Sequence, residues 1–206
     1  TSNFANDYTD GIALQTIKLV FEWLEKSVKT ADPEAREKMH NASTMAGMAF
    51  ANAFLGMSHS MAHKIGAVHH TVHGRTNAIL LPYVIRYNGT RPSKTTTWPK
   101  YNYWKADEKF QDIAKMLGLP HSTPEEAVEA YAKAVYDLGV AVGIKMNFKD
   151  QGIDEKAWKD SLHEIALLAY EDQCSPANPR LPMVADMEEI MADAYYGYAE
   201  RPGRRK

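Results

Sequence analysis

Apolar residues recur along most of the chain at intervals of three or four positions, which is the period of an amphipathic α-helix. In the first such segment, residues 10–29, these positions are Ile12, Leu14, Ile17, Val20, Phe21, Leu24 and Val28. The pattern predicts further helices over about 33–55, 59–65, 75–87, 107–117, 124–142, 154–169 and 184–196. No run of alternating β-branched residues bounded by turn residues stands between them. We therefore expect an all-α fold, a bundle of about seven to nine helices with almost no strand.

Local signals predict several helix ends. Asp32, followed by a proline, is suited to cap the second helix, and Thr123 and Glu126 have the spacing of a capping box. Ser58 is expected to cap a short helix that stops at Gly66, with the loop "AVHHTVHG" after it. The stretch "ASTMAGMAFANAFLG" is small and apolar on all sides, which predicts that the second helix is buried and central.

Composition narrows the class of protein. The 206 residues are enough for one core and one domain, and 24 basic against 26 acidic residues leave a formal net charge of −2. This balance lacks the basic footprint of a nucleic-acid-binding protein, and no apolar run reaches the length of a membrane span. Cys174 is the single cysteine, so no intrachain disulfide can form. We expect a structural thiol in a cytoplasmic protein.

The stretch "GMSHSMAHKIGAVHHTVHG" holds five of the eight histidines. His59 and His63 are four residues apart on a predicted helix and share one face, while His73 follows a loop. Imidazole is the commonest metal ligand, but the stretch lacks the glutamate that follows the first histidine in zinc proteases. On spacing alone, a metal site and ordinary core or surface histidines both remain open. Three histidines outside the stretch fit no motif and are expected at the surface: His40, His121 and His163.

The amino-acid sequence of this region resembles the signature of the iron-containing alcohol dehydrogenases. That signature is G-x-x-H-x-x-A-H-x-x-G, a short loop, H-G-x-x-N-A and L-P-x-V. It is matched by Gly56, His59, Ala62, His63, Gly66, His73, Gly74, Asn77, Ala78, Leu81, Pro82 and Val84. "TDGIALQTIKLV", "EDQCSPANPR" and "ADAYYG" are similar to the alcohol dehydrogenase half of bifunctional aldehyde-alcohol dehydrogenases. The resemblance therefore covers essentially the whole chain.

The resemblance implies a dehydroquinate synthase-like helical domain that holds iron. In this family one aspartate and three histidines bind Fe(2+), and His59 and His73 match two of the histidines. The other two ligands belong to a D-x-x-x-H motif on a preceding helix, and this chain begins after it. We therefore expect residues 1–206 to be one helical metal-binding domain, a fragment lacking the N-terminal α/β domain that binds NAD. Zinc could replace iron in vitro.

The resemblance also assigns roles to other residues. His63 faces the cleft near the nicotinamide, where it either relays a proton or orients a ligand. His70 matches a position near the cofactor. Phe50 matches the aromatic side chain of the substrate pocket, although a plain core phenylalanine explains it equally well. Val72 stands where the family usually has proline before the second histidine ligand, which removes the fixed φ angle.

These roles imply a function. The parent enzyme is expected to interconvert acetaldehyde and ethanol with NAD(H) in a fermentative bacterium, the metal acting as a Lewis acid. The chain alone is expected to be inactive, because it lacks the cofactor domain and half of the ligands. Its expected partners are that domain, a small aldehyde or alcohol, and further copies in an oligomer or filament. Phe4 and Tyr8 are expected either to make contacts between copies or to pack on the missing helix. The alternative is a metal-free structural or oligomerisation module of the same parent.

Overall fold

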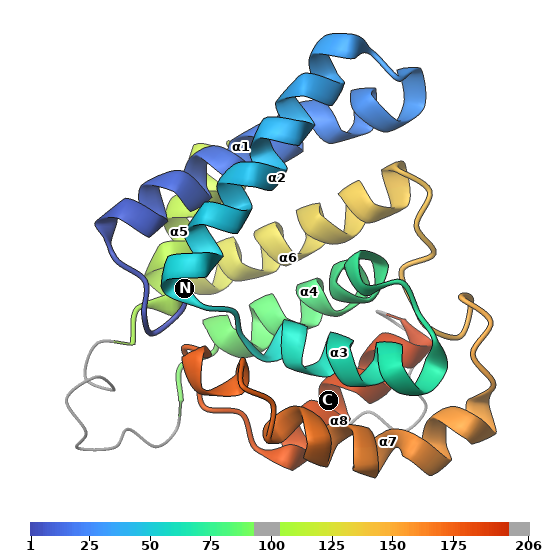
Figure 1. The fold of residues 1–206 in the computed structure, drawn as a ribbon. Coiled ribbons are helices and arrows are strands. Elements are labelled where there is room, and N and C mark those ends of the chain that lie inside the picture. Colours follow the sequence, from blue (N-terminus) through green and yellow to red (C-terminus); the bar gives the residue numbers. More distant parts are fainter. Residues whose placement is uncertain (93–103, 198–206) are drawn as a thin grey trace.

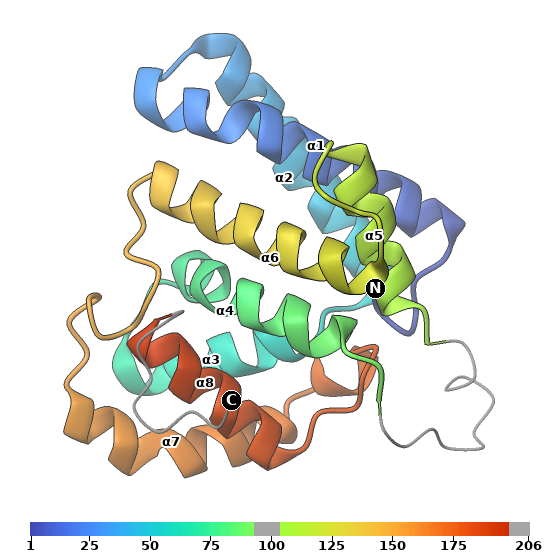
Figure 2. The ribbon, with the colours of Figure 1, turned by 180° about the vertical axis from the view of Figure 1, so that it is seen from behind.

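The computed structural model describes residues 1–92 and 104–197, and Figures 1 and 2 show it from two sides. These residues contain no strand, which confirms the all-α prediction. None of their helices combines the length and apolar character that crossing a bilayer requires. The elements are α1 (Asp7–Thr30), α2 (Pro33–Ala53), α3 (Met57–His69), α4 (His73–Gly89), α5 (Ala106–Met116), α6 (Pro124–Ala141), α7 (Glu155–Tyr170), the short 3₁₀ turn η2 (Ser175–Ala177) and α8 (Val184–Tyr196).

Helices α1 and α2 form an antiparallel hairpin along one side of the molecule (Figure 1). The buried residues of α2 include Ala35, Ala42 and Ala49, which recur every seven positions. Those of α1 are Thr9 and Thr16, again seven positions apart. A seven-residue repeat keeps one stripe of a helix against its neighbour, and such small side chains let the two backbones approach closely.

The prediction that the second helix is buried and central is wrong. Helix α2 packs along α1 and makes no comparable contact with any other described helix. Its larger apolar side chains point outward, and Met48 and Phe50 are 48% and 47% exposed. The fully buried residues of α2 are all alanines: Ala35, Ala42, Ala49 and Ala53. A segment that is apolar on all sides does not reveal which side packs against a neighbour. In α2 the small side chains mark the side that packs on α1.

The main core lies between α3, α4, α7 and α8, in the lower half of Figure 1. Its centre is Trp158, which is 2% exposed and whose ring lies 4.9 Å from that of Phe148 and 5.2 Å from that of Tyr195. A second, smaller cluster joins α4, α5 and α6 around Phe110 and Tyr131. The histidine-rich region is thus built on the best-packed part of the chain.

The boundaries of α3 differ from those predicted. Gly66 does not end the helix, which continues to His69 and stops where His70 adopts a left-handed conformation with φ 53°. The residue that precedes the helix is Gly56, and Ser58 lies inside the first turn, where its hydroxyl binds Asn77 instead of capping. The loop before α4 is only three residues long. This short connection holds the start of α4 close to α3.

Candidate metal centre

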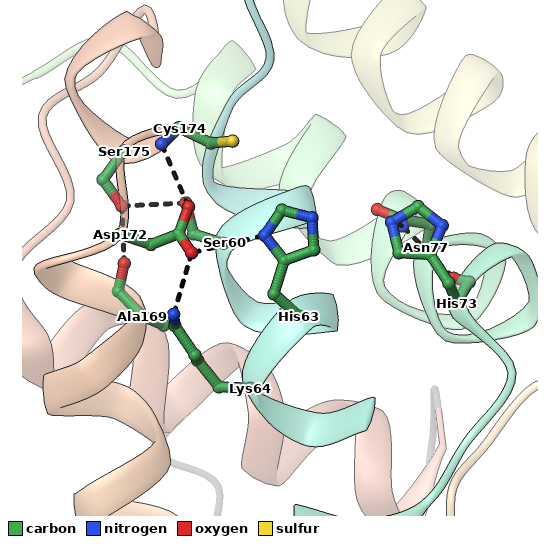
Figure 3. Close-up of polar contacts among 9 residues, drawn as sticks. All are labelled: Ser60, His63, Lys64, His73, Asn77, Ala169, Asp172, Cys174 and Ser175. Atoms are coloured by element: carbon green, nitrogen blue, oxygen red, sulfur yellow. Dashed lines mark hydrogen bonds and ion pairs between the residues drawn. The ribbon is translucent and has the colours of Figure 1, made fainter. Parts of the chain in front are cut away.

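Three imidazoles converge where α3 meets α4. His59 and His63 lie one turn apart on α3, and His73 is the first residue of α4. The ring centroid of His73 lies 5.3 Å from that of His59 and 5.5 Å from that of His63, and the two α3 rings are 6.2 Å apart. The structure therefore brings together the two predicted metal ligands and the predicted helper. Figure 3 shows His63 and His73 facing one another.

His59 has the properties of a metal ligand. Burial lowers its pKa to about 4, and the nearby imidazoles of His73 and His63 act in the same direction. The ring is therefore neutral at pH 7, the form that coordinates metals. Neither of its nitrogens donates to or accepts from any other described residue. A partly buried imidazole without a polar partner fits a site whose remaining partner is an ion.

His73 is held by neighbours on its own helix. The side-chain amide of Asn77 donates to His73 Nε2 and to the His73 carbonyl, both at 3.2 Å, and the hydroxyl of Ser58 donates to Asn77 Oδ1. A metal ion at Nε2 would compete with this amide for the lone pair. Val72 has φ −70°, close to the angle that proline would fix, so its departure from the family pattern leaves the backbone unchanged.

His63 has a partner that the sequence analysis missed. Its Nδ1 lies 3.2 Å from Oδ2 of Asp172, in the segment that follows α7, and the two residues are 109 positions apart. Lys64 Nζ lies 3.0 Å from the same oxygen, and the Cys174 backbone N–H donates to Oδ1. Burial works to raise the pKa of Asp172, but these hydrogen bonds outweigh it and lower the pKa to about 2.

His63, Asp172 and Cys174 offer another group of potential ligand atoms, all within 4.8 Å of one another. In the absence of an ion, burial first, and then the adjacent Asp172 carboxylate, raise the pKa of the Cys174 thiol to about 11. One contact argues against a metal there. The ammonium of Lys64 already neutralises the carboxylate. The buried, protonated thiol agrees with the structural role expected of this cysteine.

The remaining predicted residues lie apart from the three imidazoles. His70 is exposed at the end of α3 and lines a separate pocket of about 290 Å³ with Arg75 and Gln151. Phe50 lines a groove of about 370 Å³ between the N-terminal segment, α2 and α4, which Ser58 and Leu81 also line. This groove adjoins the imidazoles through Ser58. The histidines expected at the surface are exposed, as predicted: His40, His121 and His163.

The family follows from a comparison with known sequences. Residues 1–195 match the description "Fe-containing alcohol dehydrogenase family, C-terminal". The chain belongs to this family, as the helical fold and the converging histidines lead one to expect. The match includes the whole of α3, α4 and the segment around Asp172.

The relatives that the chain resembles are longer proteins. It is 78% identical over 205 residues to the aldehyde-alcohol dehydrogenase of Streptococcus pneumoniae, covering 100% of this chain and 23% of the relative. It is 39% identical to the bifunctional aldehyde-alcohol dehydrogenase of Escherichia coli, covering 95% and 23%. The crystal structure of a 1,3-propanediol oxidoreductase superposes with a TM-score of 0.81 and 34% identity over 94% of this chain and 47% of that one. The chain thus spans about a quarter of the first two relatives.

Proposed function

We propose that this chain is the metal-binding helical domain of an iron-dependent, NAD(H)-linked alcohol dehydrogenase whose parent interconverts acetaldehyde and ethanol. His59 and His73 are two of the metal ligands in this proposal. The observation that carries it is the approach of these two rings to 5.3 Å, with His59 neutral and free of other polar contacts among the described residues. The names of the relatives from Streptococcus pneumoniae and Escherichia coli support an aldehyde and alcohol substrate.

Each residue has a task in this reaction. A divalent ion held by His59 and His73 would supply Lewis-acid polarisation of the substrate oxygen. Until an ion binds, the Asn77 amide keeps the His73 ring in place on α4. His63 lies beside both rings and exchanges a proton with the substrate oxygen. Phe50 provides an apolar wall for a short alkyl chain in the adjoining groove.

The remaining parts come from outside these residues. We propose that an N-terminal α/β domain of the same parent binds NAD, near His70, and supplies an aspartate and a third histidine for the iron. The carboxylate matters because it favours iron(II), whereas zinc, copper or nickel would compete with iron for a site made of two imidazoles alone. The parent works in the cytoplasm and self-associates, with Phe4 and Tyr8, 45% and 57% exposed, as candidate contacts.

Metal analysis tests the ligand assignment. The 206-residue chain is compared with a version extended upstream by the helix that carries D-x-x-x-H. Tight, stoichiometric iron is expected only in the extended version, and His59→Ala or His73→Ala should abolish it. His163→Ala is the matched control, because that imidazole is exposed on α7 and pairs with Glu188. Iron retained without His59 or His73 would refute the assignment.

Two other outcomes have distinct meanings. One tightly bound ion in the short chain would mean that another residue, such as His63, completes the site. No metal in either version would favour the metal-free structural module. The 206-residue chain should also show no NADH-dependent reduction of acetaldehyde, and measurable turnover would contradict the need for the cofactor domain.

A further inference from the structure

We propose that Asp172 is a positioning residue that fixes the ring orientation and tautomer of His63. The proton of the neutral ring sits on Nδ1, which donates to Asp172, and Nε2 is presented to the substrate. The inference deepens the proposed function and rests on it. It assigns a task to a residue outside the histidine-rich stretch that carries the family signature.

The contacts of Asp172 decide which atom carries the hydrogen that it shares with His63. Its Oδ2 faces Lys64 Nζ at 3.0 Å and His63 Nδ1 at 3.2 Å, and its Oδ1 accepts from the Cys174 backbone N–H at 3.0 Å. The Lys64 ammonium and the Cys174 N–H can only donate, and the Cys174 thiol also bonds to this group. Together with His63 these contacts lower the pKa of Asp172 to about 2 against its burial, so the group they surround is a carboxylate. A carboxylate can only accept, and the hydrogen of the third contact must belong to His63 Nδ1.

The carboxylate is held rigidly against α3. The Asp172 side chain is only 7% exposed, and its backbone N–H donates to the Ala169 carbonyl at the end of α7. Ser175 ties the same segment to α3 a second time, because its hydroxyl binds that of Ser60 at 3.0 Å and the Ala169 carbonyl at 2.7 Å. Figure 3 shows these contacts on one side of His63. A carboxylate fixed in this way can fix the ring it contacts.

The free nitrogen of His63 lies on the side of the ring that faces His73. In Figure 3 the ring of His63 lies between Asp172 and His73, and Nε2 is on the side away from Asp172. During alcohol oxidation the hydroxyl proton would pass to Nε2, and a bound nicotinamide would supply the hydride acceptor. During aldehyde reduction Nε2 would return this proton to the substrate oxygen, and the reduced cofactor would supply the hydride. Asp172 gains and loses nothing in either direction, as in other carboxylate–histidine pairs.

Asp172→Asn is the informative substitution. An amide has one oxygen, and if that oxygen keeps the Cys174 N–H, the NH₂ group faces Lys64 and donates to His63 Nδ1. The ring must then carry its proton on Nε2, where it cannot accept one from the substrate. In the full-length enzyme we expect kcat to fall on the order of 10²- to 10⁴-fold, with KM and metal content unchanged.

A matched pair elsewhere provides the control. His163 Nδ1 lies 2.6 Å from Glu188 Oε1, the same kind of contact on an exposed surface. Glu188→Gln makes the same chemical change and should leave kcat unchanged. Lys64→Met removes the ion pair but keeps the Asp172–His63 contact, so it should retain most of the activity. Equal losses in Lys64→Met and Asp172→Asn would overturn the inference in favour of a purely structural ion pair.

The double variant tests whether Asp172 acts through His63. In an enzyme that already carries His63→Ala, adding Asp172→Asn should cost no further activity. Additive losses would show that Asp172 acts elsewhere and would overturn the inference. Loss of metal in His63→Ala alone would make His63 a ligand, which overturns the inference while the assignment of His59 and His73 stands.

The tautomer can be observed without turnover or metal. Long-range ¹H–¹⁵N spectra of the chain, labelled in its histidines, separate protonated from unprotonated ring nitrogens. We expect His63 in the wild-type chain to be protonated at Nδ1 and unprotonated at Nε2, with the reverse in Asp172→Asn. Protonation at Nε2 in the wild-type chain overturns the inference, even if every variant fails to fold. The proposed function fails by a different result, retention of iron without His59 or His73.

Discussion

The α1–α2 hairpin and the half formed by α3, α4, α7 and α8 are both helical but are stabilised differently. The second half contains most of the larger cluster of buried apolar residues, including the stacked rings of Trp158 and Tyr195. The hairpin buries mainly alanine and threonine, and it leaves Phe50 and Phe54 47% and 59% exposed. The half that carries the imidazoles has its own apolar core, and its α4 also packs along α6, whereas the hairpin presents apolar surface to the groove beside the imidazoles.

This difference in packing shows which part of the chain sets the geometry of the site. His59 and His63 lie on α3, between residues of the main core: Met57, Met61, Ala62 and Ile65. Rigid packing around α3 keeps the imidazoles in place before any ion or substrate arrives. The exposed face of α2 adds less to folding, because its large side chains remain about half exposed. We expect it to matter for what binds in the groove.

The largest expected effect is on the core of the second half. Trp158→Ala should lower the free energy of unfolding by about 3–5 kcal/mol, because it removes a fully buried ring between two others and leaves a cavity. Chemical denaturation of the 206-residue chain measures it. Trp23→Ala is the matched change in the hairpin, where the ring is only partly buried and lies under Lys26. An equally large loss of stability in Trp23→Ala would contradict the difference in packing between the two regions.

Replacing either of two glycines by alanine should change the free energy of unfolding in opposite directions. A Cβ on Gly89, at the end of α4, would lie 2.4 Å from Cγ2 and 2.7 Å from Cγ1 of Val128, and a β-branched side chain has little room to move. Gly89→Ala should therefore cost about 1–3 kcal/mol. Gly47 on α2 has no neighbouring atom within 4 Å of such a Cβ. Gly47→Ala should stabilise by roughly 0.5–1 kcal/mol through helix propensity, and a loss there would refute this account.

The pH dependence of stability should depend on His59 when the chain is free of metal. Its pKa is about 4 in the folded chain and about 6.5 when unfolded, so the unfolded state binds more protons between these values. Stability is therefore full above pH 6.5 and falls as the pH drops toward 4, by on the order of 1–2 kcal/mol after allowing for solvent screening.

Unfolding measured at pH 7 and pH 4.5 in the presence of a chelator tests this. His59→Gln should reduce the decrease, because the amide does not titrate. His163→Gln removes an exposed imidazole and should leave the decrease as it is in the wild-type chain. If both variants behave alike, His59 is not the group responsible.

The sequence predicted the helices well because their signals are local. The caps at Asp32, Thr123 and Asp154 each accept the backbone N–H three residues on, as the cap residues and spacing indicate. The signature also predicted that His59 and His73 lie close together, and the short loop between their helices brings them there. Asp172 had no such signal, because it is 109 positions from His63 and meets it only through the packing of α7 on α3. The exposure of α2 was missed because composition does not show which neighbours a helix has.

The smallest expected effect is on the exposed face of the hairpin. Phe50→Ala should change the stability of the 206-residue chain by no more than about 0.5 kcal/mol, because the ring is half exposed and truncating it opens no closed cavity. The same variant in the full-length enzyme should raise KM for acetaldehyde and leave metal content unchanged, since the ring lines the groove beside the imidazoles. Met48→Ala, as exposed on the same helix but outside the groove, should change neither. A stability loss above 2 kcal/mol for Phe50→Ala would mean that the hairpin depends on this ring, and that its exposed face serves folding rather than binding.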